Sequence, residues 1–114
     1  MEVTTFKITK NVRVVEDYLI KQMGMTKKSF HKKAYDDFIN SDWKIDKDLL
    51  IKDKNNPNYI VRSISEQTHL TSVQKETLKK IATDYNISMS AVLFQALSDF
   101  CLKNADIFPS DMYI

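Results

Sequence analysis

Apolar residues alternate at the start of the chain and then change to a helical spacing. Residues 3–9 (VTTFKIT) are β-branched or aromatic except for one lysine, and Phe6 and Ile8 fall on one face of an extended chain. This period of two predicts a strand. Thr9 or Asn11 is placed to cap a following helix. The apolar residues of that helix, spaced by three and four positions, are Val12, Val15, Leu19 and Met23.

A tight turn and a second helix complete the first 40 residues. Gly24 follows the last apolar position of the first helix and is expected to end it in a left-handed conformation. Thr26 is placed to cap the next helix, in which Phe30, Ala34 and Phe38 recur every four residues. The order strand, helix, turn, helix is therefore predicted for residues 1–40.

The middle of the chain has a different pattern. Residues 52–58 (KDKNNPN) hold no apolar side chain apart from the proline, which indicates a linker or surface loop. Trp43 and residues 49–51 (LLI) predict a short packed element before this loop. Residues 59–65 (YIVRSIS) are expected to be extended, because they are rich in β-branched and aromatic side chains.

A second pair of helices is expected after residue 70. Thr71 with Gln74 has the spacing of a capping box, Asn86 is placed to end that helix, and Ser88 is placed to cap the next one. The apolar face of the first of these helices consists of Leu78, Ile81, Ala82 and Tyr85. That of the second consists of Val92, Leu93, Ala96, Leu97 and Phe100.

The two halves match without a gap when the first is moved forward by 62 positions. The match is weakest in the strand, where Phe6 falls on Thr68, so a second interpretation stays open. In it the second strand begins earlier, with Ile60, Arg62 and Ile64 on its inward face. The helical pairs that match include Thr9 with Thr71, Gly24 with Asn86, Thr26 with Ser88, Ala34 with Ala96 and Phe38 with Phe100.

Composition limits the class of protein. The 114 residues carry a formal net charge of +2, with 43% hydrophobic and 28% charged residues, as in one soluble domain or two very small ones. No apolar run is long enough to span a membrane, and the N-terminus lacks a signal-peptide pattern. The single cysteine, Cys101, cannot form an internal disulfide, so a cytoplasmic location is expected. One glycine excludes glycine-rich phosphate loops.

The sequence offers no arrangement of residues typical of catalysis. His31 and His69 have no metal-ligand spacing, and Cys101 lies among apolar residues as an inert thiol would. The neighbouring pairs Glu16–Asp17 and Asp36–Asp37 are better explained by a solvated helix surface than by an acid–base dyad. We therefore expect no enzymatic activity, no catalytic residue, no cofactor and no metal.

Two stretches carry a resemblance to a known family. Residues 24–38 (GMTKKSFHKKAYDDF) and 86–100 (NISMSAVLFQALSDF) each have Gly or Asn, an aliphatic residue, Ser or Thr, and apolar positions ending in Ala-x-x-x-aromatic. Both resemble the turn and second helix of ribbon–helix–helix DNA-binding proteins, the MetJ/Arc/CopG superfamily. The resemblance covers residues 3–40 and about 60–103. Two copies in one chain resemble the TraY type of plasmid regulator, whereas typical members have one copy and form intertwined dimers.

The resemblance implies that one strand from each copy pairs antiparallel and enters the major groove of DNA, where outward side chains contact base edges. From the first strand these side chains are Val3, Thr5 and Lys7, and from the second, in the gapless register, Ser65, Gln67 and His69. If the second strand begins earlier, they are Val61, Ser63 and Ser65.

The resemblance also implies phosphate contacts at the start of the second helix of each copy, where backbone amides and the helix dipole attract anions. The residues at these places are Thr26, Lys27, Lys28, Ser29 and Lys32 in the first copy and Ser88 and Ser90 in the second. Because the second set is uncharged, the two ends are expected to anchor DNA unequally.

Together these patterns predict a mainly α fold with a short β ribbon, built as tandem ribbon–helix–helix units. The divisions are 1–40, a connecting segment 41–58, a second copy 59–104 and a tail 105–114. The expected function is a sequence-specific regulator that binds double-stranded DNA and represses transcription or controls plasmid replication or transfer. An antitoxin-like module that binds a small protein through the tail or the Trp43 segment is the alternative. Two arrangements fit the sequence. The two strands of one chain pair with each other, or two chains self-associate and like copies pair between them.

Overall fold

A computed structural model describes residues 2–104, and the tail predicted at 105–114 lies outside them. The described part is mainly helical with a small two-stranded antiparallel sheet, as the sequence predicts. The elements follow one another as β1 (Glu2–Ile8), α1 (Lys10–Met23), α2 (Lys27–Asn40), the short 3-10 helix η1 (Lys47–Leu50), β2 (Ile64–Leu70), α3 (Ser72–Asp84) and α4 (Met89–Lys103).

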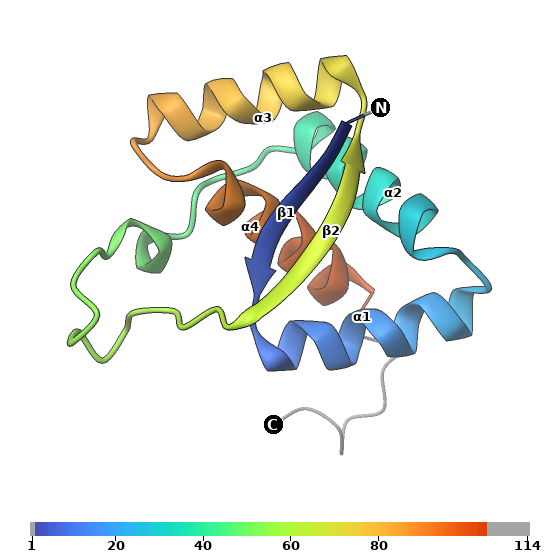
Figure 1. Ribbon diagram of the computed structural model, residues 1–114, viewed down its shortest axis with the longest axis horizontal. Helices are drawn as coiled ribbons and strands as arrows, with labels where there is room; N and C mark the ends of the chain where they lie inside the picture. Colours follow the sequence, from blue (N-terminus) through green and yellow to red (C-terminus); the bar gives the residue numbers. More distant parts are fainter. Residues whose placement is uncertain (1, 105–114) are drawn as a thin grey trace.

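The helices cover one face of the two-stranded ribbon and leave the other face open (Figure 1). α4 packs against β1, α2 packs against β2, and these two helices also pack against each other. α1 and α3 lie at opposite ends of the ribbon (Figure 1). The connecting segment runs along the β1 side, where η1 lies. The open face is thus flanked by the starts of α2 and α4 on opposite sides.

The strands pair in the gapless register. Thr5 lies opposite Gln67, and Ile8 lies opposite Ile64. The alternative in which Ile60 and Arg62 form the inward face of the second strand is therefore wrong, and residues 59–63 precede the strand. Two polar residues, Glu66 and Thr68, occupy inward positions because buried partners on the helices satisfy them.

The helix ends follow the local chemistry of the sequence. Thr9 rather than Asn11 caps α1, and both Thr26 and Thr71 form capping boxes. Ser88 caps α4 by accepting a hydrogen bond from the backbone N–H of Ala91. Gly24 (φ 64°) and Asn86 (φ 53°) both adopt the left-handed conformation that ends the helix before each turn.

Side chains from both halves share one core. Phe38 and Phe100 are buried where α2 and α4 pack together, and Cys101 is buried as expected, which raises the pKa of its thiol to about 12. Two expectations need correction. Tyr85 is 42% exposed rather than buried, although its ring contacts Trp43. In α1 the fully buried side chains are Leu19 and Glu16, while Val12, Val15 and Met23 are only partly covered.

The packed element expected near Trp43 is present in part. The Trp43 ring stacks on Phe38 at 5.6 Å between centroids, and residues 47–50 form η1. Gln95 of α4 holds this segment by accepting a hydrogen bond from the backbone N–H of Asp46 at 2.8 Å. Within residues 2–104, no helix combines the length and the apolar character that crossing a bilayer requires.

Replacing Phe100 with alanine tests the packing of α4. The Phe100 ring packs edge to face against the Phe30 ring, with 5.1 Å between the ring centroids. Phe100→Ala should therefore lower the free energy of unfolding by about 3 to 5 kcal/mol. Lys33→Ala is the control, because Lys33 is exposed on α2. Denaturant melts measure both, and equal small losses would contradict the assigned helical faces.

Candidate nucleic-acid interface

The open face of the ribbon carries all six side chains that the resemblance assigns to base contacts. Val3 pairs with His69, Thr5 with Gln67 and Lys7 with Ser65 across the two strands. All are exposed except His69, which is half-buried. Strand alternation causes this arrangement, since the inward neighbours Phe6, Ile8, Glu66, Thr68 and Leu70 are buried. The face combines an ammonium, three polar side chains, an imidazole and one aliphatic group.

The start of α2 lies beside β2, but several of its side chains are already engaged. Thr26 and Ser29 bond to each other's backbone N–H in the capping box. Lys32 forms an ion pair with Asp36 at 2.9 Å. Lys27 and Lys28 are both exposed, but Lys27 lies 3.7 Å from a carboxylate oxygen of Glu66, whereas Lys28 forms no ion pair with a described residue. Lys28 is therefore the side chain most available to a phosphate group at this end.

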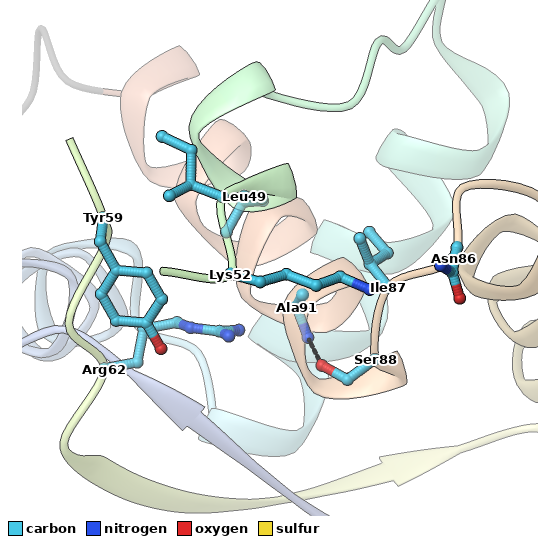
Figure 2. Close-up of a pocket in the computed structure, with 9 residues that line it drawn as sticks. Leu49, Lys52, Tyr59, Arg62, Asn86, Ile87, Ser88 and Ala91 are labelled. Atoms are coloured by element: carbon cyan, nitrogen blue, oxygen red, sulfur yellow. Dashed lines mark hydrogen bonds between the residues drawn. The ribbon is translucent and has the colours of Figure 1, made fainter. Parts of the chain in front are cut away.

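The start of α4 lies beside β1, and its two serines have structural partners. Ser88 caps the helix, while the Ser90 hydroxyl accepts a hydrogen bond from the backbone N–H of Lys7 at 3.0 Å. The sequence predicts an uncharged end here, and this expectation is incomplete. Lys52 and Arg62, on either side of the loop, line a pocket of about 440 Å³ next to Ser88. Lys52 extends across this pocket toward Ile87 (Figure 2).

Arg62 is the most constrained cation of that pocket. Its guanidinium carbon lies 5.6 Å from the centre of the Phe94 ring, and burial lowers the pKa of the guanidinium. Its Nη1 atom is buried without a hydrogen-bond partner among the described residues. No carboxylate lines the pocket, so this end carries two positive charges that the sequence of α4 does not contain.

A cluster of polar side chains is buried directly under β2. Glu16 of α1 and Glu66 of β2 both lie against Nε2 of His31 on α2, at 2.6 and 2.8 Å. The other ring nitrogen, Nδ1, lies 2.9 Å from the Thr68 hydroxyl, which lies 2.6 Å from the Tyr35 hydroxyl. Because two carboxylates converge on Nε2, this nitrogen carries a hydrogen and donates it to them.

The environment of the cluster shifts the pKa of each group. Burial raises the pKa of Glu16 to about 7, although the hydrogen bond with His31 opposes this rise. Burial acts to lower the pKa of His31, but hydrogen bonds to Glu16 and Glu66 outweigh it, so this pKa is raised. Burial acts to raise the pKa of Glu66, and the hydrogen bonds from His31 and Glu16 with the charge of Lys27 bring it down to about 2. Burial also raises the pKa of Tyr35.

Sequence spacing gave no indication of this cluster, because its members come from three separate elements. One signal was nevertheless present. Glu16 lies four residues after Val12 and three before Leu19, inside the apolar stripe of the first helix. A charged residue at such a position needs a buried partner. At the positions 62 residues further on, Leu78 and Leu93 replace Glu16 and His31.

The pKa shifts predict a dependence of stability on pH, measured in buffer containing a chelator. Because the folded pKa of Glu16 is raised above its ordinary value of 4.5, its contribution is complete below pH 4.5 and is lost as pH rises toward about 7. The raised pKa of His31 extends this loss above pH 6.5. Glu66, whose pKa is lowered, loses its contribution only as pH falls from 4.5 toward 2.

Glu16→Gln removes the first of these titrations. Relative to this variant, the unchanged chain should lose about 1 to 3 kcal/mol of unfolding free energy between pH 5 and about pH 8. Asp17→Asn, at the exposed neighbouring position, should leave the pH dependence as it is in the unchanged chain. Urea melts at each pH measure the difference, and parallel curves for the chain and Glu16→Gln would contradict the assignment.

Comparison with known proteins adds no assignment to this geometry. No family model matches the chain, and no curated protein or solved structure matches it either.

Proposed function

We propose that the chain is a sequence-specific regulator that binds double-stranded DNA with its β ribbon in the major groove. In this proposal residues 3–40 and 64–103 are two ribbon–helix–helix units of one chain, similar to TraY-type plasmid regulators. The observation that carries the proposal is the open, polar face of the ribbon, flanked on opposite sides by the starts of α2 and α4. A two-stranded ribbon fits the major groove, where every base pair presents a distinct pattern of donors and acceptors.

The strand register supports the interpretation as two related units. A shift of 62 positions carries Val3 onto Ser65 and Lys7 onto His69. The pair Val3–His69 therefore maps onto the pair Lys7–Ser65, and Thr5 maps onto its own partner Gln67. This is the pattern expected when two copies of one unit pair about a twofold axis. Here the axis passes through the Thr5–Gln67 pair, so one chain provides the complete ribbon.

The side chains of the open face suit base contacts. Lys7 can donate to O6 or N7 of guanine, Gln67 can bind adenine with its amide, and Thr5 offers a hydroxyl and a methyl group. Lys28 at the start of α2 and Lys52 beside the start of α4 are placed to contact phosphate on either side of the groove. Bound in this way, the protein would act by occluding a promoter or an origin, without catalysis.

The antitoxin-like alternative remains a prediction. One partner surface that it uses, residues 105–114, lies outside the described residues. In the other, the Trp43 ring is packed between Phe38 and Tyr85, which leaves less of it to bind a partner.

Two substitutions separate base contacts from phosphate contacts. Lys7→Ala should weaken binding to a selected site by about 1 to 3 kcal/mol more than binding to random duplex. Lys28→Ala should weaken both equally and reduce the slope of log affinity against log salt by about one unit. Titrations of both duplexes at several salt concentrations measure this, with light scattering to show one chain per site. An unchanged specificity ratio in folded Lys7→Ala would contradict the ribbon as the element that selects sequence.

A further pair of variants tests the second end. Lys52→Ala should flatten the salt dependence by about one unit, because Lys52 supplies the charge that the start of α4 lacks. Lys54→Ala is the matched control, since Lys54 is an exposed lysine of the same loop that does not line the pocket. Equal slopes for these two variants would rule out a specific phosphate contact by Lys52.

A further inference from the structure

Three buried side chains bring their ligand atoms to one point beneath β2. Glu16, His31 and Glu66 are 0%, 1% and 4% exposed, and one potential ligand atom of each lies within 4.8 Å of the others. They come from α1, α2 and β2, so the point lies where three elements meet. The second carboxylate oxygen of Glu16, Oε1, is buried and accepts no hydrogen bond from any described residue. Its charged neighbours, Arg13 Nε at 3.9 Å and Lys27 Nζ at 4.0 Å, are too far away to donate a hydrogen bond, so this buried oxygen has room for a closer positive partner.

We propose that Glu16, His31 and Glu66 form a binding site for one divalent transition-metal ion, with Zn²⁺ as the best match. An imidazole nitrogen with two carboxylate oxygens is a ligand set that suits Zn²⁺ better than Mg²⁺, which prefers oxygen ligands and retains its water. Glu16 Oε1 or a water molecule would complete four-coordinate geometry. The ligand geometry on which this inference rests does not involve DNA.

The surroundings of His31 suit a metal ligand. Its Nδ1 faces the hydroxyl of Thr68, to which it can donate, and Tyr35 fixes that hydroxyl from the other side. Such a hydrogen bond to the far nitrogen would set the tautomer of the metal-bound ring, in which Nε2 gives up its hydrogen and binds the metal. Nε2 is also the nitrogen that faces both carboxylates. The orientation of the ring is therefore fixed before any ion binds.

Only a small movement is needed to admit the ion. Zn²⁺ binds nitrogen and oxygen at about 2.0 to 2.2 Å, which places tetrahedral ligands about 3.3 Å apart. The present separations of 2.6 and 2.8 Å must therefore open by about 0.5 to 0.7 Å, which rotation of the carboxylates can supply. A depression of about 460 Å³ in the surface, bordered by Arg13, Lys27 and His69, leads to the cluster.

The charges near the cluster permit a metal ion to replace protons of the cluster. Arg13 lies 3.1 Å from Glu66, and Lys27 lies within 4.0 Å of both glutamates. Their side chains are 33% and 43% exposed and can turn toward solvent, whereas the carboxylates cannot. An ion of charge +2 that replaces two protons of the cluster leaves the formal charge unchanged. Metal binding therefore releases protons, and the affinity should rise with pH.

The matching positions of the other half show that the helices do not require polar side chains here. Leu78 and Leu93 lie where the repeat offset places Glu16 and His31, and both are fully buried. Apolar residues of suitable volume commonly stabilise a core at least as well as a buried ionic cluster does. A polar cluster at this one position therefore fits a role in binding better than a role in packing alone.

The test uses the full chain freed of metal with a chelator and then titrated with Zn²⁺. Calorimetry should give one Zn²⁺ per chain, thermal melts should shift upward, and Mg²⁺ at the same concentration should do neither. Co²⁺ should give the visible absorption of a tetrahedral site that Zn²⁺ removes. In the NMR spectrum of the unchanged chain, the imidazole signals of His31 should shift while those of His69 stay in place.

The variants use the chain's own residues as controls. Glu16→Leu with His31→Leu copies Leu78 and Leu93, keeps Arg13 and Lys27 as partners of Glu66, and should lose Zn²⁺ binding at least 100-fold. Thr68→Val, which removes the hydroxyl that faces both Nδ1 and Tyr35, should weaken binding about 10- to 100-fold. His69→Ala changes the one other histidine and should bind Zn²⁺ as the unchanged chain does.

The proposal fails if the chain binds no Zn²⁺, if the double leucine variant retains binding, or if His69→Ala loses it. In the first case the cluster shares protons only, and in the other two the metal binds at the surface. The NMR measurement on the unchanged chain decides the question even if the double variant does not fold. None of these measurements uses DNA. The proposed function is tested separately, by the DNA titrations.

Discussion

The pairing of β1 with β2 is the interaction on which the rest of the structure depends. Two seven-residue strands are too few to be stable alone, so the ribbon persists only because helices bury its inner face. Phe6 and Ile8 of β1 and Leu70 of β2 supply the apolar part of that face. Closing the long connection between the strands costs little more than closing a short one, because loop entropy grows only with the logarithm of length. One chain can therefore hold both strands without a second copy.

The same pairing buries a charged side chain of one strand beside an apolar side chain of the other. Glu66 lies opposite Phe6, so a carboxylate is buried across from an aromatic ring. Such a group is stable only while its partners are complete, since removing one partner leaves an uncompensated charge in the core. His31 of α2 and Arg13 of α1 both bond to the Glu66 carboxylate, and Lys27 of α2 lies 3.7 Å from it. The position of α1 and α2 relative to β2 is therefore fixed by hydrogen bonds as well as by apolar packing.

The sequence predicted what depends on neighbouring residues and missed what depends on distant ones. The caps at Thr26, Thr71 and Ser88 and the left-handed turns at Gly24 and Asn86 follow from local chemistry, and all are observed. The strand register followed from the internal repeat even though its apolar pattern was poor. The apolar pattern did not reveal the second strand because its inward positions 66 and 68 hold the polar residues Glu66 and Thr68 instead of apolar ones.

Two features of the candidate site lay beyond such reasoning. Lys52 and Arg62 come to the start of α4 only through the path of the connecting segment, which no local pattern determines. Likewise, the spacing of Glu16 and His31 along the chain says nothing of Glu66, which joins them only when the strands pair. The charges in the helix sequences therefore underestimate the positive charge available at the start of α4. They overestimate it at the start of α2, where Lys27 and Lys32 are already paired with carboxylates.

Lys27 lies between the proposed metal site and the proposed DNA-binding face. Its side chain is 43% exposed and its ammonium lies 3.7 Å from Glu66, so this ion pair contributes at most about 1 kcal/mol and could be exchanged for a phosphate contact in the proposed DNA complex. If the proposed DNA complex drew Lys27 away, Glu66 would lose a positive neighbour, and the proposed metal site would hold its cation more tightly. A metal ion beside Glu66 would in turn release Lys27 toward phosphate. Because such coupling is reciprocal, metal and DNA would each strengthen the binding of the other.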